Sequence, residues 1–197
     1  QNEDFKLVKG KSALFGVPRK VLFQSKWSLT MIAVKTLRKI VSRIDIELSS
    51  KIMYRTFLHK KLNLDNPRTF NEKLCWLKLR QFPNDAQVVR CADKYMVREY
   101  ISGKKHEELL VSLIDVWDRA EDIDWDSLPE KFVLKCNHGC AYNLICSDKK
   151  RFDKNKAMKT LRNWLSEDFG LVSGEPHYSK IKRKIICEEF LDGELMD

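Results

Sequence analysis

Residues 132–146, with the sequence FVLKCNHGCAYNLIC, combine the residue types of an anion-binding site. Lys135 follows a short apolar run, and Gly139 lies in a polar stretch where a ligand can approach the backbone closely. One ammonium group and exposed backbone N–H groups can together hold phosphate oxygens. Hairpins also carry a lysine and a glycine for solubility and for the turn alone, so this stretch by itself does not identify a site.

The element that positions Lys135 is predicted to be a β-hairpin. Phe132–Leu134 and Tyr142–Cys146 have the apolar character of strands, and residues 137–139 supply turn chemistry between them. A second stretch, residues 184–194 (KIICEEFLDGE), predicts another buried strand at Ile185–Cys187. Paired carboxylates, an apolar pair and a glycine turn follow that strand, and Glu194 closes the turn.

These two stretches resemble the nucleotide-binding lobe of ATP-grasp enzymes. Two further features narrow the resemblance to one family of these enzymes: the run of residues 66–73 (NPRTFNEK) and the cluster Asp93-Lys94-Tyr95. From about Leu64 to its last residue, the chain resembles the TupA-like ATP-grasp family of bacterial surface-polysaccharide biosynthesis loci.

The resemblance implies a nucleotide site with a role for each group of residues. Lys94 and Lys135 would contact the phosphates, with a weaker case for Arg98, and the loop of residues 137–143 would close over them. The backbone at 189–191 would meet the adenine edge, with Glu188 near the amino group and Glu194 accepting from the ribose hydroxyls. The expected cofactor-binding residues are Lys94, Lys135, Asn137, His138, Gly139, Glu188, Glu189, Phe190, Leu191 and Glu194. Ala141 stands where the family has a second glycine, which reduces the backbone freedom at the loop tip.

The chemistry that the resemblance implies is amide formation driven by ATP and Mg²⁺. ATP-grasp ligases phosphorylate a carboxylate to an acyl phosphate, which an amine or similar nucleophile then displaces. The acid would be a uronic acid or an acidic amino acid polymer. In the family the Mg²⁺ ligands follow the hinge that ends here at Glu194, whereas this chain ends at Asp197. Either the chain is part of a longer protein or it is not a working ligase, so no catalytic or metal-binding residue is named.

The elements around the site predict an α+β fold. Helices are predicted over about residues 69–80, 85–102 and 153–168, and a strand over residues 109–116. Thr69 and Glu72 form a capping box at the start of the first of these helices, and Lys94 and Arg98 share one face of the second. We expect a basic helical region at 1–62, a helical or mixed region at 63–127, and at 128–197 the nucleotide-binding lobe, a small antiparallel sheet with helices.

The positive charge is concentrated in the first third of the chain. Up to Lys61 there are 14 Lys and Arg against 4 Asp and Glu, a net +10 that leaves −1 for the rest of a chain of net charge +9. Apolar residues from Leu29 to Leu48 recur at helical spacing, with basic residues off the stripe. One interpretation is a helix that packs on its own domain. The other is peripheral contact with a membrane or glycolipid through residues 19–61.

Composition indicates a cytoplasmic protein, peripheral at the inner membrane surface under the second interpretation. No apolar run could span a membrane, and the six cysteines form no CxxC pair, as in a reducing compartment. A metal site at Cys136, His138, Cys140 and Cys146 is disfavoured by its spacing. The expected partners are a nucleotide and an acidic or lipid-linked glycan acceptor, and nucleic acid is not expected.

Two other functions remain open on the sequence. One is a glycosyltransferase or other transferase of the same polysaccharide pathway, which would use the D-x-D triplets of residues 122–126 to hold a metal and a sugar nucleotide. The other is a non-catalytic basic module that binds a membrane or nucleic acid through residues 1–62.

Overall fold

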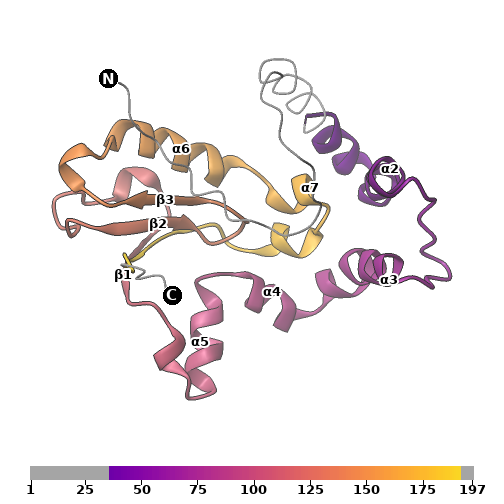
Figure 1. The fold of residues 1–197 in the computed structure, drawn as a ribbon, viewed down its shortest axis with the longest axis horizontal. Coiled ribbons are helices and arrows are strands. Elements are labelled where there is room, and N and C mark those ends of the chain that lie inside the picture. Colours follow the sequence, from indigo (N-terminus) through magenta and orange to yellow (C-terminus); the bar gives the residue numbers. More distant parts are fainter. Residues whose placement is uncertain (1–35, 192–197) are drawn as a thin grey trace, which may run out of the picture. The chain divides into compact units, whose positions relative to one another are not determined.

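A computed structural model describes residues 36–191, which lie in one compact unit that begins at Lys35. Its centre is a four-stranded antiparallel sheet in the order β1-β4-β2-β3 (Figure 1). The strands are β1 (Leu113–Trp117), β2 (Phe132–Cys136), β3 (Asn143–Cys146) and β4 (Ile185–Glu189). The predicted hairpin and the predicted final strand are thus confirmed, as is the α+β class with a small antiparallel sheet.

Helices precede the sheet and are inserted between its strands. After a helix at residues 36–44, the α-helices are α2 (Ile46–Leu58), α3 (Phe70–Trp76), α4 (Ala86–Ala92), α5 (Met96–Gly103), α6 (Lys154–Ser166) and α7 (Phe169–Ser173). A π-helix, η1 (Leu77–Gln81), extends α3, and the 3₁₀-helices are η2 (Phe82–Asn84), η3 (Glu107–Leu109), η4 (Ala120–Asp122), η5 (Lys149–Arg151) and η6 (Pro176–Lys180).

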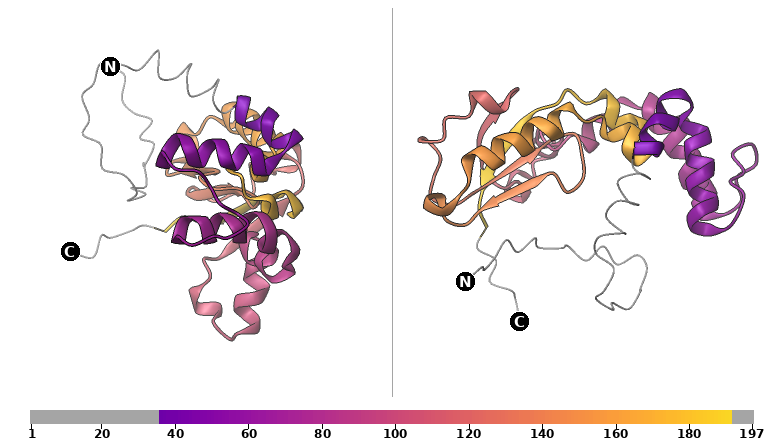
Figure 2. Two further views of the ribbon diagram at one scale, coloured as in Figure 1. Left: turned by 90° about the vertical axis from the view of Figure 1, so that its right-hand side faces the viewer. Right: turned by 90° about the horizontal axis from the view of Figure 1, so that it is seen from above.

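The sheet buries one face against α6. Alternation along β2 sends Phe132, Leu134 and Cys136 to the same side, where they pack with Leu161 of α6 in the main core. Figure 1 and Figure 2 show α6 running along the β2–β3 hairpin. The opposite face receives Lys135, which is opposite Asn143 on β3 and Ile186 on β4.

The helix predicted over residues 85–102 is wrong as one continuous element. It is divided into α4 and α5 at Asp93, whose backbone is extended, with φ −80° and ψ 112°. The Asp93 carboxylate accepts hydrogen bonds from the N–H groups of Tyr95 (2.8 Å) and Met96 (3.3 Å), so it caps the second helix. The apolar stripe continues across the break and conceals it in the sequence.

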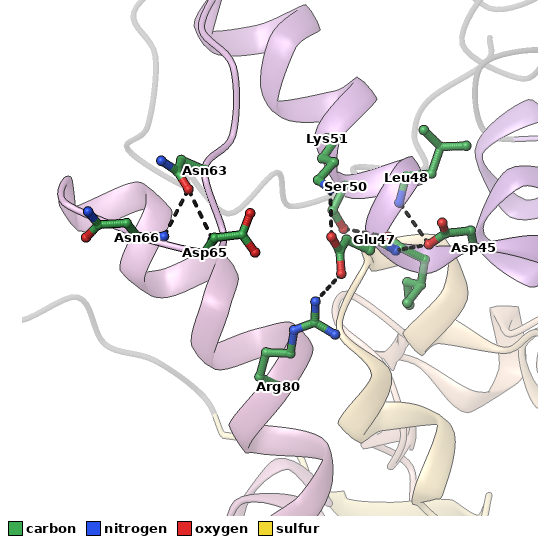
Figure 3. A network of polar contacts seen from close by, with 10 residues as sticks. Asp45, Glu47, Leu48, Ser50, Lys51, Asn63, Asp65, Asn66 and Arg80 are labelled. Carbon is green, nitrogen blue, oxygen red and sulfur yellow. Dashed lines mark hydrogen bonds and ion pairs between the residues drawn. The ribbon is translucent and has the colours of Figure 1, made fainter.

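Asp45 interrupts the basic apolar stripe in the same way. The helix of residues 36–44 ends before it, and its side chain caps α2 by accepting from the N–H groups of Glu47 and Leu48 (Figure 3). The single amphipathic helix suggested by the spacing is therefore two helices. The part of the stripe at Leu29, Ile32 and Ala33 lies outside the described residues.

Other boundaries differ by a few residues. The capping box at Thr69 and Glu72 is confirmed, and the helix predicted from about residue 153 is α6, which begins at Lys154 with Asp153 as its N-cap. The strand expected over residues 109–116 begins only at Leu113, because residues 107–109 form a 3₁₀ turn. Asp168 does not end a single helix but caps the separate helix α7.

No helix in residues 36–191 combines the length and the apolar character needed to cross a bilayer. The division of the chain at residues 62 and 127 stays a prediction.

Candidate functional site

Lys135 and Glu188 form an ion pair on the face of the sheet that does not contact α6. Lys135 is opposite Ile186, two residues before Glu188, so the two charged side chains meet diagonally across β2 and β4. Arg98 of α5 binds the same carboxylate, with 3.3 Å between Nη1 and Oε1, and its Nη2 donates to the carbonyl of Val111 at 2.7 Å. Glu188 is 7% exposed and is held between two cations.

Lys94 lies in the break between α4 and α5 and joins it to the hairpin loop. Its ammonium donates to the carbonyl oxygens of Gly139 and, at 3.4 Å, Cys136. Its backbone N–H donates to the carbonyl of Asn137 at 3.2 Å. Asp93, the preceding residue, accepts from Asn137 Nδ2 at 2.8 Å. The Asp93-Lys94-Tyr95 cluster and the hairpin loop, noted separately in the sequence, therefore form one structural unit.

The environment of Lys94 favours an anionic partner. Burial lowers the pKa of its ammonium, and the positive charge of Lys135 acts in the same direction, although the nearby thiols of Cys140 and Cys136 oppose it. A phosphate placed beside both lysines would reverse these effects, because a neighbouring anion stabilises the charged form of each. In this structure both ammonium groups have protein acceptors, the loop carbonyls for Lys94 and Glu188 for Lys135.

Asn137 and His138 are buried, and their side chains support the loop from within. Asn137 Nδ2 also donates to the carbonyl of Lys182 at 2.9 Å, while its Oδ1 accepts from the N–H of Lys184 at 2.7 Å. His138 Nε2 donates to the carbonyl of Trp164 at 3.1 Å, and burial lowers the pKa of the ring. The backbone of Asn137 is also engaged, because its N–H donates to the carbonyl of Lys184 at 3.1 Å and its carbonyl accepts from Lys94.

The packing of aromatic rings around the hairpin loop requires a glycine at residue 139. A Cβ atom there would lie 2.5 Å from the ring of Tyr142 and 3.1 Å from that of Phe169. Tyr142 is stacked on Trp164 with 5.0 Å between ring centroids, and its hydroxyl donates to Glu167 at 2.5 Å. The ring therefore has little room to move away, and the loop conformation depends on the missing side chain.

The loop tip adopts the backbone that a glycine would favour. Ala141 has φ 62°, in the left-handed region where a Cβ atom is unfavourable. Cys140 and Ala141 are exposed, and in residues 36–191 their backbone N–H groups have no hydrogen-bond acceptor. Ala141, in place of the second glycine expected from the resemblance, therefore strains the loop but leaves N–H donors at its tip.

The end of β4 carries the residues that the resemblance assigns to the adenine edge. The Glu189 N–H donates to the carbonyl of Ser112 at 3.0 Å, and its side chain is exposed. Phe190 and Leu191 lie past the last paired residue of the strand, so their backbone is outside the sheet ladder. The Lys131 ammonium lies 5.5 Å from the centroid of the Phe190 ring, and Leu191 is 65% exposed. Glu194 lies outside the described residues.

Residues 36–191 contain no group of three His, Cys, Asp or Glu side chains able to hold a metal ion. Cys136 and Cys146 are buried thiols, and burial raises the pKa of Cys136 to about 12. The acids of the D-x-D segment are on the surface, where Asp122 lies 3.8 Å from Arg119 and Asp126 lies 3.4 Å from Lys154.

The sequence made Arg98 a weaker candidate than Lys94, whereas in the structure Arg98 contacts Glu188 directly. The capping role of Asp93 was not predicted. The four-residue step from Lys94 to Arg98 was the available signal for Arg98. The Asp-x-x sequence just before Met96 was the corresponding signal for the cap. Neither signal names its partner, because Asn137 and Glu188 are distant in the chain.

Comparison with known proteins identifies the family of the chain. A sequence model described as TupA-like ATPgrasp matches residues 72–195, which is more than half of the chain and includes every residue of the candidate site. No curated protein and no solved structure matches the chain. The chain therefore belongs to the TupA-like ATPgrasp family and has a fold of the ATP-dependent ligase type.

Proposed function

We propose that this protein binds ATP and takes part in joining a carboxylate to an amine in the synthesis of a bacterial surface polysaccharide. The observation that carries the proposal is the set of three cations in a chain of this family: Lys94 binds the hairpin loop, and Arg98 and Lys135 share the Glu188 carboxylate. These groups come from a helix break, a helix and a strand, so they meet only in the folded protein.

The phosphates are proposed to bind between Lys94, Lys135 and the exposed N–H groups at the loop tip. An ammonium donates three hydrogen bonds, and the contact of Lys135 with Glu188 uses one of them. Glu188 would then hold the Lys135 ammonium in place while the phosphate binds on its other side. A carboxylate has about four acceptor sites and two are used by the cations, so Glu188 keeps acceptor capacity for the adenine amino group, near which the resemblance places it.

The adenine edge is proposed to meet the backbone of residues 189–191, and Glu194 is proposed to bind the ribose. Support for the first of these is the unpaired backbone that follows β4. The acid to be activated is proposed to be an acidic glycan or a lipid-linked glycan, a substrate class that the net charge of +9 would attract. Mg²⁺ is implied by the family, but residues 36–191 offer no set of ligands for it, so no step is assigned to a metal here.

Calorimetric titration with a non-hydrolysable ATP analogue tests the proposal. We expect binding by the wild-type chain and a dissociation constant at least tenfold higher for Lys135→Met, because a charge-assisted hydrogen bond contributes about 1.5 to 3 kcal/mol. Lys159→Met is the matched control, since Lys159 is an exposed lysine of α6. Absence of binding by the wild type, or equal losses in the two variants, would contradict the proposal.

The same titration with a sugar nucleotide tests the transferase alternative. A sugar nucleotide that binds more tightly than the ATP analogue, with affinity lost in Asp124→Asn, would favour that function. The structure adds no support for it, because within residues 36–191 the Asp124 side chain accepts from the N–H of Asp126, at 3.1 Å, and has no other hydrogen-bond partner.

A further inference from the structure

The first two helices expose the apolar side chains that their spacing would normally bury. Leu37, Ile40 and Ile44 are 63%, 52% and 83% exposed, and on α2 Leu48 and Ile52 are 47% and 44% exposed. The buried positions of these helices include Ser42 and Ser49, whose hydroxyls share a hydrogen bond of 2.8 Å. The face that packs on the rest of the unit is thus partly polar, and large aliphatic side chains remain on the surface.

The exposed face of α2 leads into a basic hollow. Leu48, Ile52 and Arg55 follow one another at steps of four and three residues, so they share one side of the helix, and His59 caps its C-terminal end. A hollow of about 320 Å³ lies there, lined by Lys51, Ile52, Arg55, Lys61 and Leu62. Beside it is a second, of about 380 Å³, lined by Arg55, His59, Lys60 and Lys61.

Three of the cations in these hollows have no carboxylate partner among the described residues. Lys51 is paired with Glu47 at 2.7 Å, and Glu47 also binds Arg80 of η1 (Figure 3). Arg55, Lys60 and Lys61 form no ion pair within residues 36–191. The hollow therefore carries a concentrated positive charge that an anion would neutralise.

We infer that this surface docks on an anionic lipid bilayer. In this arrangement the phosphate of a lipid headgroup occupies the hollow at Arg55, Lys60 and Lys61, and Leu48 and Ile52 enter the interface beside it. Basic residues next to aliphatic ones on one helix face are the combination that holds a helix in the plane of an anionic membrane.

Charge and side-chain type select this occupant over two others. A second copy meeting the same face in a two-fold dimer would bring the two basic hollows toward each other, which like charges oppose. Single-stranded nucleic acid is held by cations together with aromatic side chains that stack on the bases. Here the apolar residues that line the hollows, Ile52 and Leu62, are aliphatic, and the exposed aromatic side chain of α2, Phe57, lines neither hollow. The inference does not depend on ATP binding.

Sedimentation of the full chain with vesicles tests the inference. The probes are vesicles of phosphatidylcholine alone and of phosphatidylcholine with 30% phosphatidylglycerol, at about 0.1 M salt. We expect binding only to the anionic vesicles, and for Arg55→Gln/Lys60→Gln/Lys61→Gln a partition constant lower by about a hundredfold, at about fivefold per cation. Leu48→Ser/Ile52→Ser should lower it by about tenfold, since two half-exposed aliphatic side chains no longer enter the interface.

A variant with the same loss of charge elsewhere is the control. Arg151→Gln/Lys159→Gln/Lys180→Gln removes three exposed cations outside the first two helices and should change the partition constant by less than about fivefold. Each variant is first shown to unfold at the temperature of the wild type. Three outcomes would overturn the inference: wild-type chain that does not sediment with anionic vesicles, equal losses in the two triple variants, or wild-type binding abolished by an equimolar amount of free glycerol phosphate. The last outcome would assign the hollow to a soluble phosphate.

Discussion

Glu188 accepts hydrogen bonds from Lys135 on the neighbouring strand and from Arg98 on α5, and its own side chain is almost fully buried. Of these three charges, only the carboxylate has two partners of opposite sign. If Lys135 or Arg98 is removed, Glu188 keeps one cation, whereas removal of Glu188 leaves two cations facing each other.

Glu188→Gln should therefore destabilise the protein more than Lys135→Met does. We expect a loss of about 2 to 3 kcal/mol in the free energy of unfolding for Glu188→Gln and about 1 kcal/mol for Lys135→Met, whose side chain is partly exposed. Urea unfolding followed by circular dichroism measures both. Equal losses, or a larger loss for Lys135→Met, would contradict the asymmetry of the cluster.

Gly139→Ala should destabilise the hairpin by overpacking. The new methyl group would overlap the Tyr142 ring, which Trp164 and Phe169 hold in place. We expect a loss of about 1 to 3 kcal/mol in unfolding free energy. Gly103→Ala is the matched control, because a Cβ atom at Gly103 meets nothing within 4 Å and alanine favours the helix there. A neutral Gly139→Ala would show that the loop can rearrange.

The local parts of this structure could be predicted from the sequence. The hairpin follows from apolar runs around turn residues, and the caps at Thr69 and Asp153 follow from side chains that bond to N–H groups two or three residues away. The breaks at Asp45 and Asp93 were missed because the apolar spacing continues across them. An aspartate within such a stripe can cap a new helix as readily as it can face solvent.

The contacts between distant segments could not be predicted in this way. Periodicity defined the stripe from Leu29 to Leu48 but did not say which face of the helices would pack on the rest of the unit. Likewise, the family resemblance placed Lys135 and Glu188 in one site but did not give their direct contact. Such contacts depend on strand order and register, which are set by the whole sheet.

Ala141→Gly should stabilise the loop. Ala141 has φ 62°, a conformation that costs an alanine about 1 to 2 kcal/mol and a glycine almost nothing. After allowance for the greater chain entropy of glycine in the unfolded state, the expected gain is roughly 0.5 to 1 kcal/mol. Thermal unfolding measures it. Ala92→Gly, within α4, should have the opposite sign, and a loss of stability in both variants would show that Ala141 is not strained.

His138 should make the protein less stable in acid. Burial lowers the pKa of its ring below the ordinary 6.5, so between that lowered pKa and 6.5 the unfolded chain binds more protons than the folded one. Stability therefore rises with pH through this window and is lost as the pH falls, by at most about 1.4 kcal/mol per pH unit for one proton.

The variant His138→Gln isolates this contribution, because glutamine can still donate to the Trp164 carbonyl but does not titrate. Its free energy of unfolding, measured by urea titration between pH 7 and pH 5, should fall less steeply than that of the wild type. Burial also lowers the pKa of His177, so His177→Gln should remove a second, separate part of the pH dependence. The unfolding free energy of the double variant should then depend on pH less than that of either single variant. If the free energies of unfolding of the wild type and of His138→Gln fell equally steeply with pH, protonation of the buried His138 ring would not destabilise the fold.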